Sequence, residues 1–198
     1  TERAIERWIS NAKDSEYCRS VASDPRGQRL LQAIAGNSPF LANYLQRDAN
    51  LFCQLLQDGP DVVFKEILTR VKNTFDPFRD TASVMFVLRE AKRHASMTIG
   101  VADIAEVWDV DRIMQNLSYF ADATISVATR HALCQAANAG RIPLINPSTP
   151  DIGSGYVVLA LGKLGAQELN YSSDVDLIIL YDPERLPHDN PDMIGANY

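Results

Sequence analysis

The sequence is poor in cysteine and contains no long apolar run. Its three cysteines, Cys18, Cys53 and Cys134, are odd in number and far apart, so they form neither a disulfide framework nor a metal-binding cluster. We interpret them as reduced thiols in the core. The longest apolar run covers residues 156–161, far below the roughly 20 residues of a membrane-spanning helix, and we find no signal peptide. These absences predict a soluble, cytoplasmic protein that does not cross a membrane.

An excess of basic residues is also missing. Lys and Arg number 19 against 25 Asp and Glu, which gives a formal net charge of −6 and a pI of about 5.0. Broad electrostatic attraction to nucleic acid or to an anionic membrane is therefore not expected. Because 46% of the 198 residues are hydrophobic, the chain can bury a core and form one or two domains. The composition favours a protein or a small molecule as the substrate.

The most informative stretch lies near the C-terminal end, where two apolar segments flank a Gly-Lys pair. Residues 156–161 predict a buried strand, and residues 164–169 have the length and composition of a short helix. Residues 170–173, Asn-Tyr-Ser-Ser, predict a turn, and residues 174–181 predict a second strand rich in Leu and Ile.

Two aspartates interrupt the second predicted strand. Aspartate is depleted in strands, and a carboxylate away from water is costly unless it is paired or bound to a metal. Alternation along a strand would place Asp174 and Asp176 on one face, about 6.6 Å apart along the backbone. Two carboxylates at this spacing can reach a pair of divalent ions about 3.5–4 Å apart. We expect metal binding; two solvent-facing aspartates at the start of an edge strand are the alternative.

Gly162 and Lys163 follow the first predicted strand and indicate contact with phosphate. Glycine allows close approach of the backbone, lysine adds a cation, and the next helix would offer free N–H groups. A Walker loop does not fit, because it needs Gly and Ser or Thr where the chain has Val157 and Leu164. A dinucleotide fingerprint and an EF-hand loop fail too, because their glycines and oxygen ligands are missing at the required positions.

The order of strand, Gly-Lys, short helix and Asp-x-Asp resembles the nucleotidyltransferase superfamily. More closely, Gly162-Lys-Leu-Gly165 and Glu168-Leu-Asn-Tyr-Ser-Ser-Asp-Val-Asp-Leu-Ile179 resemble the family of the bifunctional glutamine synthetase adenylyltransferase/adenylyl-removing enzyme. The chain departs from that family at Ala166, where a second glycine is common. It also departs at Gln167, where the family commonly has a basic or small residue. Both departures lie between the phosphate-side and metal-side residues.

The resemblance implies an α+β fold that is mainly α. Residues 1–108 would form a helical region, and residues 109–198 the first part of a DNA-polymerase-beta-like nucleotidyltransferase domain with a small sheet. The superfamily places a third metal-binding carboxylate on a later strand, and neither Asp182 nor the aspartates of the polar loop at residues 183–191 and beyond fit that role. We therefore expect a fragment of a longer protein, with the third carboxylate beyond Tyr198.

The resemblance also implies roles for individual residues. Asp174 and Asp176 would be the catalytic carboxylates that bind Mg²⁺. Gly162 and Lys163 would bind phosphate or nucleotide. Ser172 and Ser173 would donate to the same phosphate, although local turn and capping bonds explain these two hydroxyls equally well.

The segment from Asn170 to Asp174 resembles the adenylyl-removing half of the family, since the adding half tends to have Ala before Ser-Asp. The implied reaction is phosphorolysis, in which inorganic phosphate removes AMP from a tyrosine of glutamine synthetase and gives ADP. The implied partners are glutamine synthetase, ATP or ADP, phosphate and a PII-type nitrogen-signalling protein. Alternatives are the adding half, which transfers AMP from ATP, another nucleotidyl transfer, and a fragment that only binds glutamine synthetase or the signalling protein.

Residues 1–138 predict helix almost throughout. The longest predicted helices cover residues 80–105 and 109–140, each with apolar residues on one face. A helix is also expected at residues 60–75, and Ser38 with Pro39 predicts a capped helix start. We interpret the remaining candidates for function on these helices as packing or surface residues: His94, His131, Trp8, Trp108, Arg89, Lys92 and Arg93.

Overall fold

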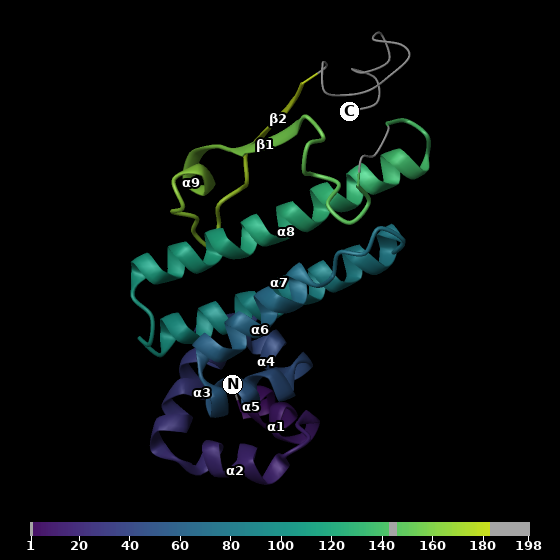
Figure 1. Cartoon of the computed structure of the whole chain (residues 1–198). Helices are drawn as coiled ribbons and strands as arrows, with labels where there is room; N and C mark the ends of the chain where they lie inside the picture. Colours follow the sequence, from purple (N-terminus) through teal and green to yellow (C-terminus); the bar gives the residue numbers. More distant parts are fainter. Residues whose placement is uncertain (1, 143–145, 183–198) are drawn as a thin grey trace. The chain divides into compact units, whose positions relative to one another are not determined.

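The computed structural model of the chain describes residues 2–142 and 146–182, and most of these are helical (Figure 1). The helices are α1 (Glu2–Asn11), α2 (Ser15–Ser23), α3 (Pro25–Asn37), α4 (Pro39–Arg47), α5 (Ala49–Asp58), α6 (Pro60–Lys72), α7 (Thr81–Ile104), α8 (Val110–Asn138) and α9 (Gly162–Gly165). In this part of the chain β1 (Tyr156–Ala160) and β2 (Leu177–Tyr181) form a two-stranded antiparallel sheet. The predicted class, α+β and mainly α, is confirmed.

The chain divides into two compact units. The first consists of Thr1–Thr69 and Arg89–Asn116, and the second of Arg70–Leu88 and Leu117–Tyr198. Helices α1 to α5 belong to the first unit, whereas β1, α9 and β2 belong to the second. The division predicted from the sequence, residues 1–108 and 109–198, concerns the domains of the longer protein and stays a prediction.

Local capping fixes where helices of the first unit begin. Asp24 accepts hydrogen bonds from two backbone N–H groups in the first turn of α3. Ser38 Oγ accepts a hydrogen bond of 3.2 Å from the N–H of Leu41 at the start of α4, and Pro39 occupies the first helical position. Both arrangements satisfy amide groups that a helix start leaves without partners. The predicted cap at Ser38 is confirmed.

The core of the first unit is built around Trp8, which has no solvent exposure. Its ring packs edge-on against Phe52, with 5.3 Å between centroids, and its Nε1–H donates to the carbonyl oxygen of Ala49. Arg93 makes two hydrogen bonds to the carboxylate of Asp48, at 2.7 and 3.2 Å. The packing role predicted for Trp8 is confirmed, and Arg93 serves as a structural ion-pair partner.

All three cysteines are free and buried, as predicted. In the first unit Cys18 of α2 and Cys53 of α5 touch through their sulfur atoms, 2.8 Å apart. Burial raises the pKa of the Cys18 thiol, and the hydrogen bond to Cys53 adds to this rise. Burial likewise raises the pKa of Cys134, on α8. The folded chain therefore holds these two thiols in their protonated, unreactive form.

The predicted long helices agree with the structure to within two residues at each end. Residues 80–105 correspond to α7 and residues 109–140 to α8. The helix predicted over residues 60–75 is shorter, because α6 ends at Lys72. Among the helices of the described ranges, none combines the length and the apolar character that a bilayer span requires.

The sheet pairs Tyr156 with Tyr181 at one end and Ala160 with Leu177 at the other. The second predicted strand, residues 174–181, is therefore too long, and Asp174 and Asp176 precede β2 instead of lying inside it. Exposure alternates along β1, whereas all five residues of β2 are exposed, at 39–50% of their surface. The burial predicted for the strand at residues 156–161 is therefore not found in the described part of the chain, where β1 is only half-buried.

A single turn, α9, replaces the helix predicted over residues 164–169. After this turn Gln167 adopts a φ of +60°, which a continuing α-helix does not allow. Leu164 and Leu169 nevertheless reach the core, where they pack with Ala121 of α8. Through these contacts, the connection between β1 and β2 packs against α8 within the second unit.

Candidate functional site

The predicted phosphate-side and metal-side residues meet where the chain leaves β1 and enters β2. The N–H of Leu161 donates a hydrogen bond of 2.9 Å to the backbone carbonyl of Asp176, which extends the strand pairing by one step. Gly162 then turns with a φ of +55°, in the left-handed region that favours glycine. A Cβ at Gly162 would lie 3.9 Å from Oδ2 of Asp176. The glycine thus leaves open the space beside this carboxylate.

Asp174 and Asp176 are both exposed. Neither forms an ion pair with a residue that the structure describes, so both carboxylates can bind a cation from solution. In residues 2–142 and 146–182 there is no cluster of three His, Cys, Asp or Glu side chains that could hold a metal. Two exposed carboxylates are oxygen donors of the kind that Mg²⁺ prefers, and this ion usually keeps several waters. The third ligand expected beyond Tyr198 lies outside the described residues.

The turn before the aspartates is held by the side chain of Asn170. Its Oδ1 accepts the N–H of Ser172 at 3.2 Å and the hydroxyl of Ser173 at 2.6 Å. Ser173 Oγ also accepts the N–H of Asn170 at 3.3 Å. The single proton of the Ser173 hydroxyl is therefore used inside the turn. This is the local turn bond that we considered as the alternative to phosphate binding. Ser172 binds Asn170 through its backbone N–H, and phosphate binding by the Ser172 hydroxyl stays a prediction.

Lys163 is exposed on α9 and makes no ion pair with any described residue. The other end of this turn approaches β1 closely. A Cβ at Gly165 would lie only 2.5 Å from the carbonyl oxygen of Ala160. Position 165 thus has no room for a side chain, so glycine is required there. The close contact with β1 fixes the position of the turn from which Lys163 extends. The predicted phosphate contact of Lys163 stays a prediction.

Two polar residues of α8 anchor the same connection, and sequence analysis missed both. Ser118, which is fully buried, accepts a hydrogen bond of 3.1 Å from the N–H of Leu169. Asp122 accepts a hydrogen bond of 3.0 Å from the side-chain amide of Gln167. Each partner pair is separated by more than forty residues of sequence, so no local pattern signals these contacts.

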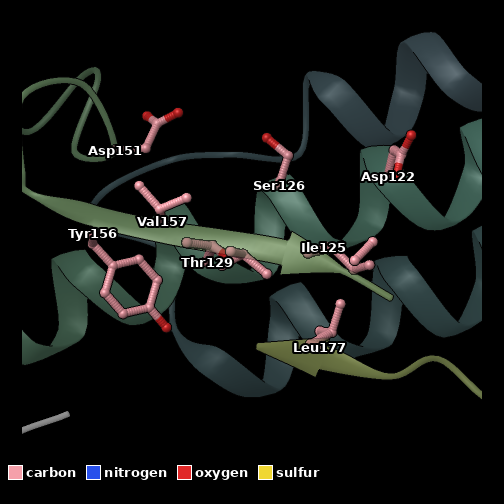
Figure 2. Close-up of a pocket in the computed structure, with 10 residues that line it drawn as sticks. Asp122, Ile125, Ser126, Thr129, Asp151, Tyr156, Val157 and Leu177 are labelled. Atoms are coloured by element: carbon pink, nitrogen blue, oxygen red, sulfur yellow. The ribbon is translucent and has the colours of Figure 1, made fainter. Parts of the chain in front are cut away.

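A hollow of about 330 Å³ lies on the α8 side of β1 (Figure 2). Asp122 and Ser126 of α8 line it together with Asp151 and Tyr156, and burial raises the pKa of the Tyr156 phenol. Leu177 also lines this hollow, whereas Gly162 and Asp176 do not. The hollow is therefore separate from the Gly162 and Asp176 pair.

Comparison with known proteins places this chain in a family. A family model described as glutamate-ammonia ligase adenylyltransferase matches residues 28–197. A bifunctional glutamine synthetase adenylyltransferase/adenylyl-removing enzyme of Bradyrhizobium sp. (strain ORS 278) is 35% identical over 192 residues, which are 95% of this chain and 20% of that protein. The protein of the same description from Rhodopseudomonas palustris (strain BisB5) is 38% identical over 184 residues, 91% of this chain and 19% of its own length.

The chain thus spans about a fifth of the length of the relatives it matches. No solved structure gives a significant match. The matched residues include Gly162 to Ile179, on which the resemblance rests, so that resemblance is confirmed. The chain belongs to the glutamate-ammonia ligase adenylyltransferase family.

Proposed function

We propose that the chain carries the phosphate-binding and metal-binding segment of an adenylyl-removing active site. The observation that supports this proposal is that Gly162, with no side chain, lies beside the exposed carboxylate of Asp176. This arrangement brings a glycine turn, where a ligand can approach the backbone closely, next to an exposed carboxylate that can bind a metal. The description of the relatives, which names an adenylyltransferase and an adenylyl-removing enzyme, supports nucleotidyl transfer to or from glutamine synthetase.

In the proposed reaction, an oxygen of inorganic phosphate attacks the phosphorus of an adenylylated tyrosine of glutamine synthetase. The bond from phosphorus to the tyrosine oxygen breaks, ADP leaves, and the phenolate takes up a proton. Asp174 and Asp176 would hold Mg²⁺, and the chemistry that this ion would supply is neutralisation of negative charge on the phosphate oxygens. Lys163, exposed on α9, would add a positive charge near the phosphate. In this proposal the residues position the phosphate and neutralise its negative charge, as phosphoryl-type transfer requires.

The removing direction is favoured by the segment Asn170 to Asp174, whose two serines resemble that half of the family. Transfer of AMP from ATP is the second candidate, because the relatives carry both activities in their description. The same segment would contact ATP in that case, with the phenol of glutamine synthetase as the attacking group. The remaining proposals, a PII-type regulator and a cytoplasmic location, rest on the family resemblance.

The test uses the full-length protein, adenylylated glutamine synthetase, Mg²⁺ and inorganic phosphate, with ADP release as the readout. Asp176→Asn should nearly abolish phosphate-dependent ADP release, because one of the two carboxylates proposed to bind the metal is gone. Asp111→Asn is the matched control, since this exposed aspartate in the first turn of α8 lies outside the site. It should release ADP at the normal rate.

Normal turnover by Asp176→Asn would refute the assignment. If the wild-type protein labels glutamine synthetase from ATP and releases no ADP with phosphate, the adding direction is correct. If the protein binds glutamine synthetase but neither removes nor adds AMP, the chain serves to recognise glutamine synthetase and not to catalyse the transfer.

A further inference from the structure

The segment that leads to the two aspartates has anchors at both ends. At its start, the N–H of Leu169 is bound by Ser118 of α8. At its end, the carbonyl of Asp176 accepts the N–H of Leu161. Between these anchors, residues 170–176 form neither helix nor strand. The positions of Asp174 and Asp176 therefore depend on how the intervening turn is held.

Asn170 takes part in four hydrogen bonds of this turn. Its side-chain oxygen accepts the Ser172 N–H at 3.2 Å and the Ser173 hydroxyl at 2.6 Å. Its own N–H donates to Ser173 Oγ at 3.3 Å, and its carbonyl accepts the Ser173 N–H at 3.2 Å. When the side-chain oxygen of an asparagine accepts the backbone N–H of the second residue after it, the side chain takes the place of one backbone unit of a turn.

We propose that Asn170 is a positioning residue for Asp174 and Asp176, which rests on the proposed function. The side chain of Asn170 is exposed, so its role is not core packing. Its oxygen uses both acceptor sites inside the turn, and it reaches the site only through Ser172 and Ser173. Without this oxygen, the turn loses two of its four bonds, and the carboxylates that follow sample several positions.

The chain contains a matched control for this role. Asn146 also accepts the N–H of the second residue after it, Ser148, at 2.9 Å, in a turn outside the site. Asn146→Ala therefore removes the same kind of hydrogen bond from the second unit without touching the segment before Asp174. Asn170→Asp is the conservative variant, because a carboxylate oxygen can accept the same two bonds.

The experiment measures Mn²⁺ binding by electron paramagnetic resonance, ADP release and thermal unfolding in the full-length protein. Asn170→Ala should weaken Mn²⁺ binding several-fold and lower kcat roughly ten- to a hundredfold, the scale of an ångström-sized misplacement at an active site. The melting temperature should stay within about 2 °C of the wild type, since few bonds are lost. Asn170→Asp should restore most of the Mn²⁺ binding, and Asn146→Ala should behave as the wild type.

The two proposals fail separately. If the wild type releases no ADP but Mn²⁺ binding is lost in Asn170→Ala and kept in Asn170→Asp, the proposed reaction is wrong and the positioning role stands. Wild-type Mn²⁺ binding and turnover in Asn170→Ala would overturn the positioning role. So would a wild-type protein that binds no Mn²⁺, or a loss in Asn170→Ala that Asn146→Ala reproduces.

Discussion

Gly165 offers a direct test of the way the site is built, because its substitution adds one methyl group at a defined place. An added Cβ would lie 2.5 Å from the carbonyl oxygen of Ala160 and 3.2 Å from its carbonyl carbon. Both atoms belong to the backbone of β1, which is held in register with Leu177. Real Cβ atoms essentially never approach closer than 3.0 Å, so Gly165→Ala must move β1 and α9 apart by at least 0.5 Å.

The cost of such overpacking is about 1–3 kcal/mol, which corresponds to a melting temperature lower by about 2–12 °C for a chain of this size. The same shift moves Gly162 away from Asp176, since both lie next to the displaced backbone. A displacement of this size at an active site lowers turnover by up to about a hundredfold. Thermal unfolding followed by circular dichroism, with ADP release on the full-length protein, measures both effects.

Gly36→Ala is the control. A Cβ at this position in α3 meets no atom within 4 Å, so the substitution should stabilise the helix by about 0.5–1 kcal/mol. If Gly165→Ala melts at or above the wild-type temperature while Gly36→Ala behaves as expected, the close approach of α9 to β1 is wrong.

Hydrogen bonds from the hydroxyl and the N–H of Ser83 lower the pKa of the Asp80 carboxylate below its usual 3.8. The ionised carboxylate therefore stabilises the folded chain above pH 3.8, and this contribution is lost as the pH falls through the lower pKa of the folded state. Asp80→Ala should therefore melt below the wild type at pH 6, with a gap that narrows below pH 4 in a pH series; a gap independent of pH would contradict this. The buried thiols of Cys18, Cys53 and Cys134 should resist iodoacetamide at pH 8 until denaturant is added, and mass spectrometry showing alkylation of the folded chain would contradict their burial.

Local chemistry made much of the helical region predictable. The ends of α7 and α8 follow from apolar periodicity, and the start of α4 follows from Ser38 and Pro39. The boundaries near the site depended on partners elsewhere in the chain. The helix expected at residues 164–169 ends after one turn, the chain changes direction at Gln167, and Leu169 is then bound by Ser118, a residue 51 positions away. No periodicity contains that information.

The candidate site divides in the same way. The spacing of Gly162 and Asp176 predicted that they belong together, and the structure places them side by side. The strand assignment of Asp174 and Asp176 failed because the regular pairing ends at Ala160 and Leu177, and only one further hydrogen bond, from Leu161 to Asp176, follows before Gly162 turns the chain. Asn170 was predicted as part of a turn, but its four bonds became visible only with the side chains in place.

The exposure of β2 in the described residues has a consequence for work with the 198-residue chain in solution. Leu177 to Tyr181 is an uncharged, apolar strand that, in the described part of the chain, pairs with β1 on one side only. Such segments drive aggregation by strand-to-strand association, and flanking charges oppose it. In the 198-residue chain the flanking charges are Asp176 and Asp182, so the carboxylate proposed to bind metal would also oppose self-association of this strand. Asp176→Asn removes both effects, and its activity should be compared with the wild type only in fractions shown to be monomeric.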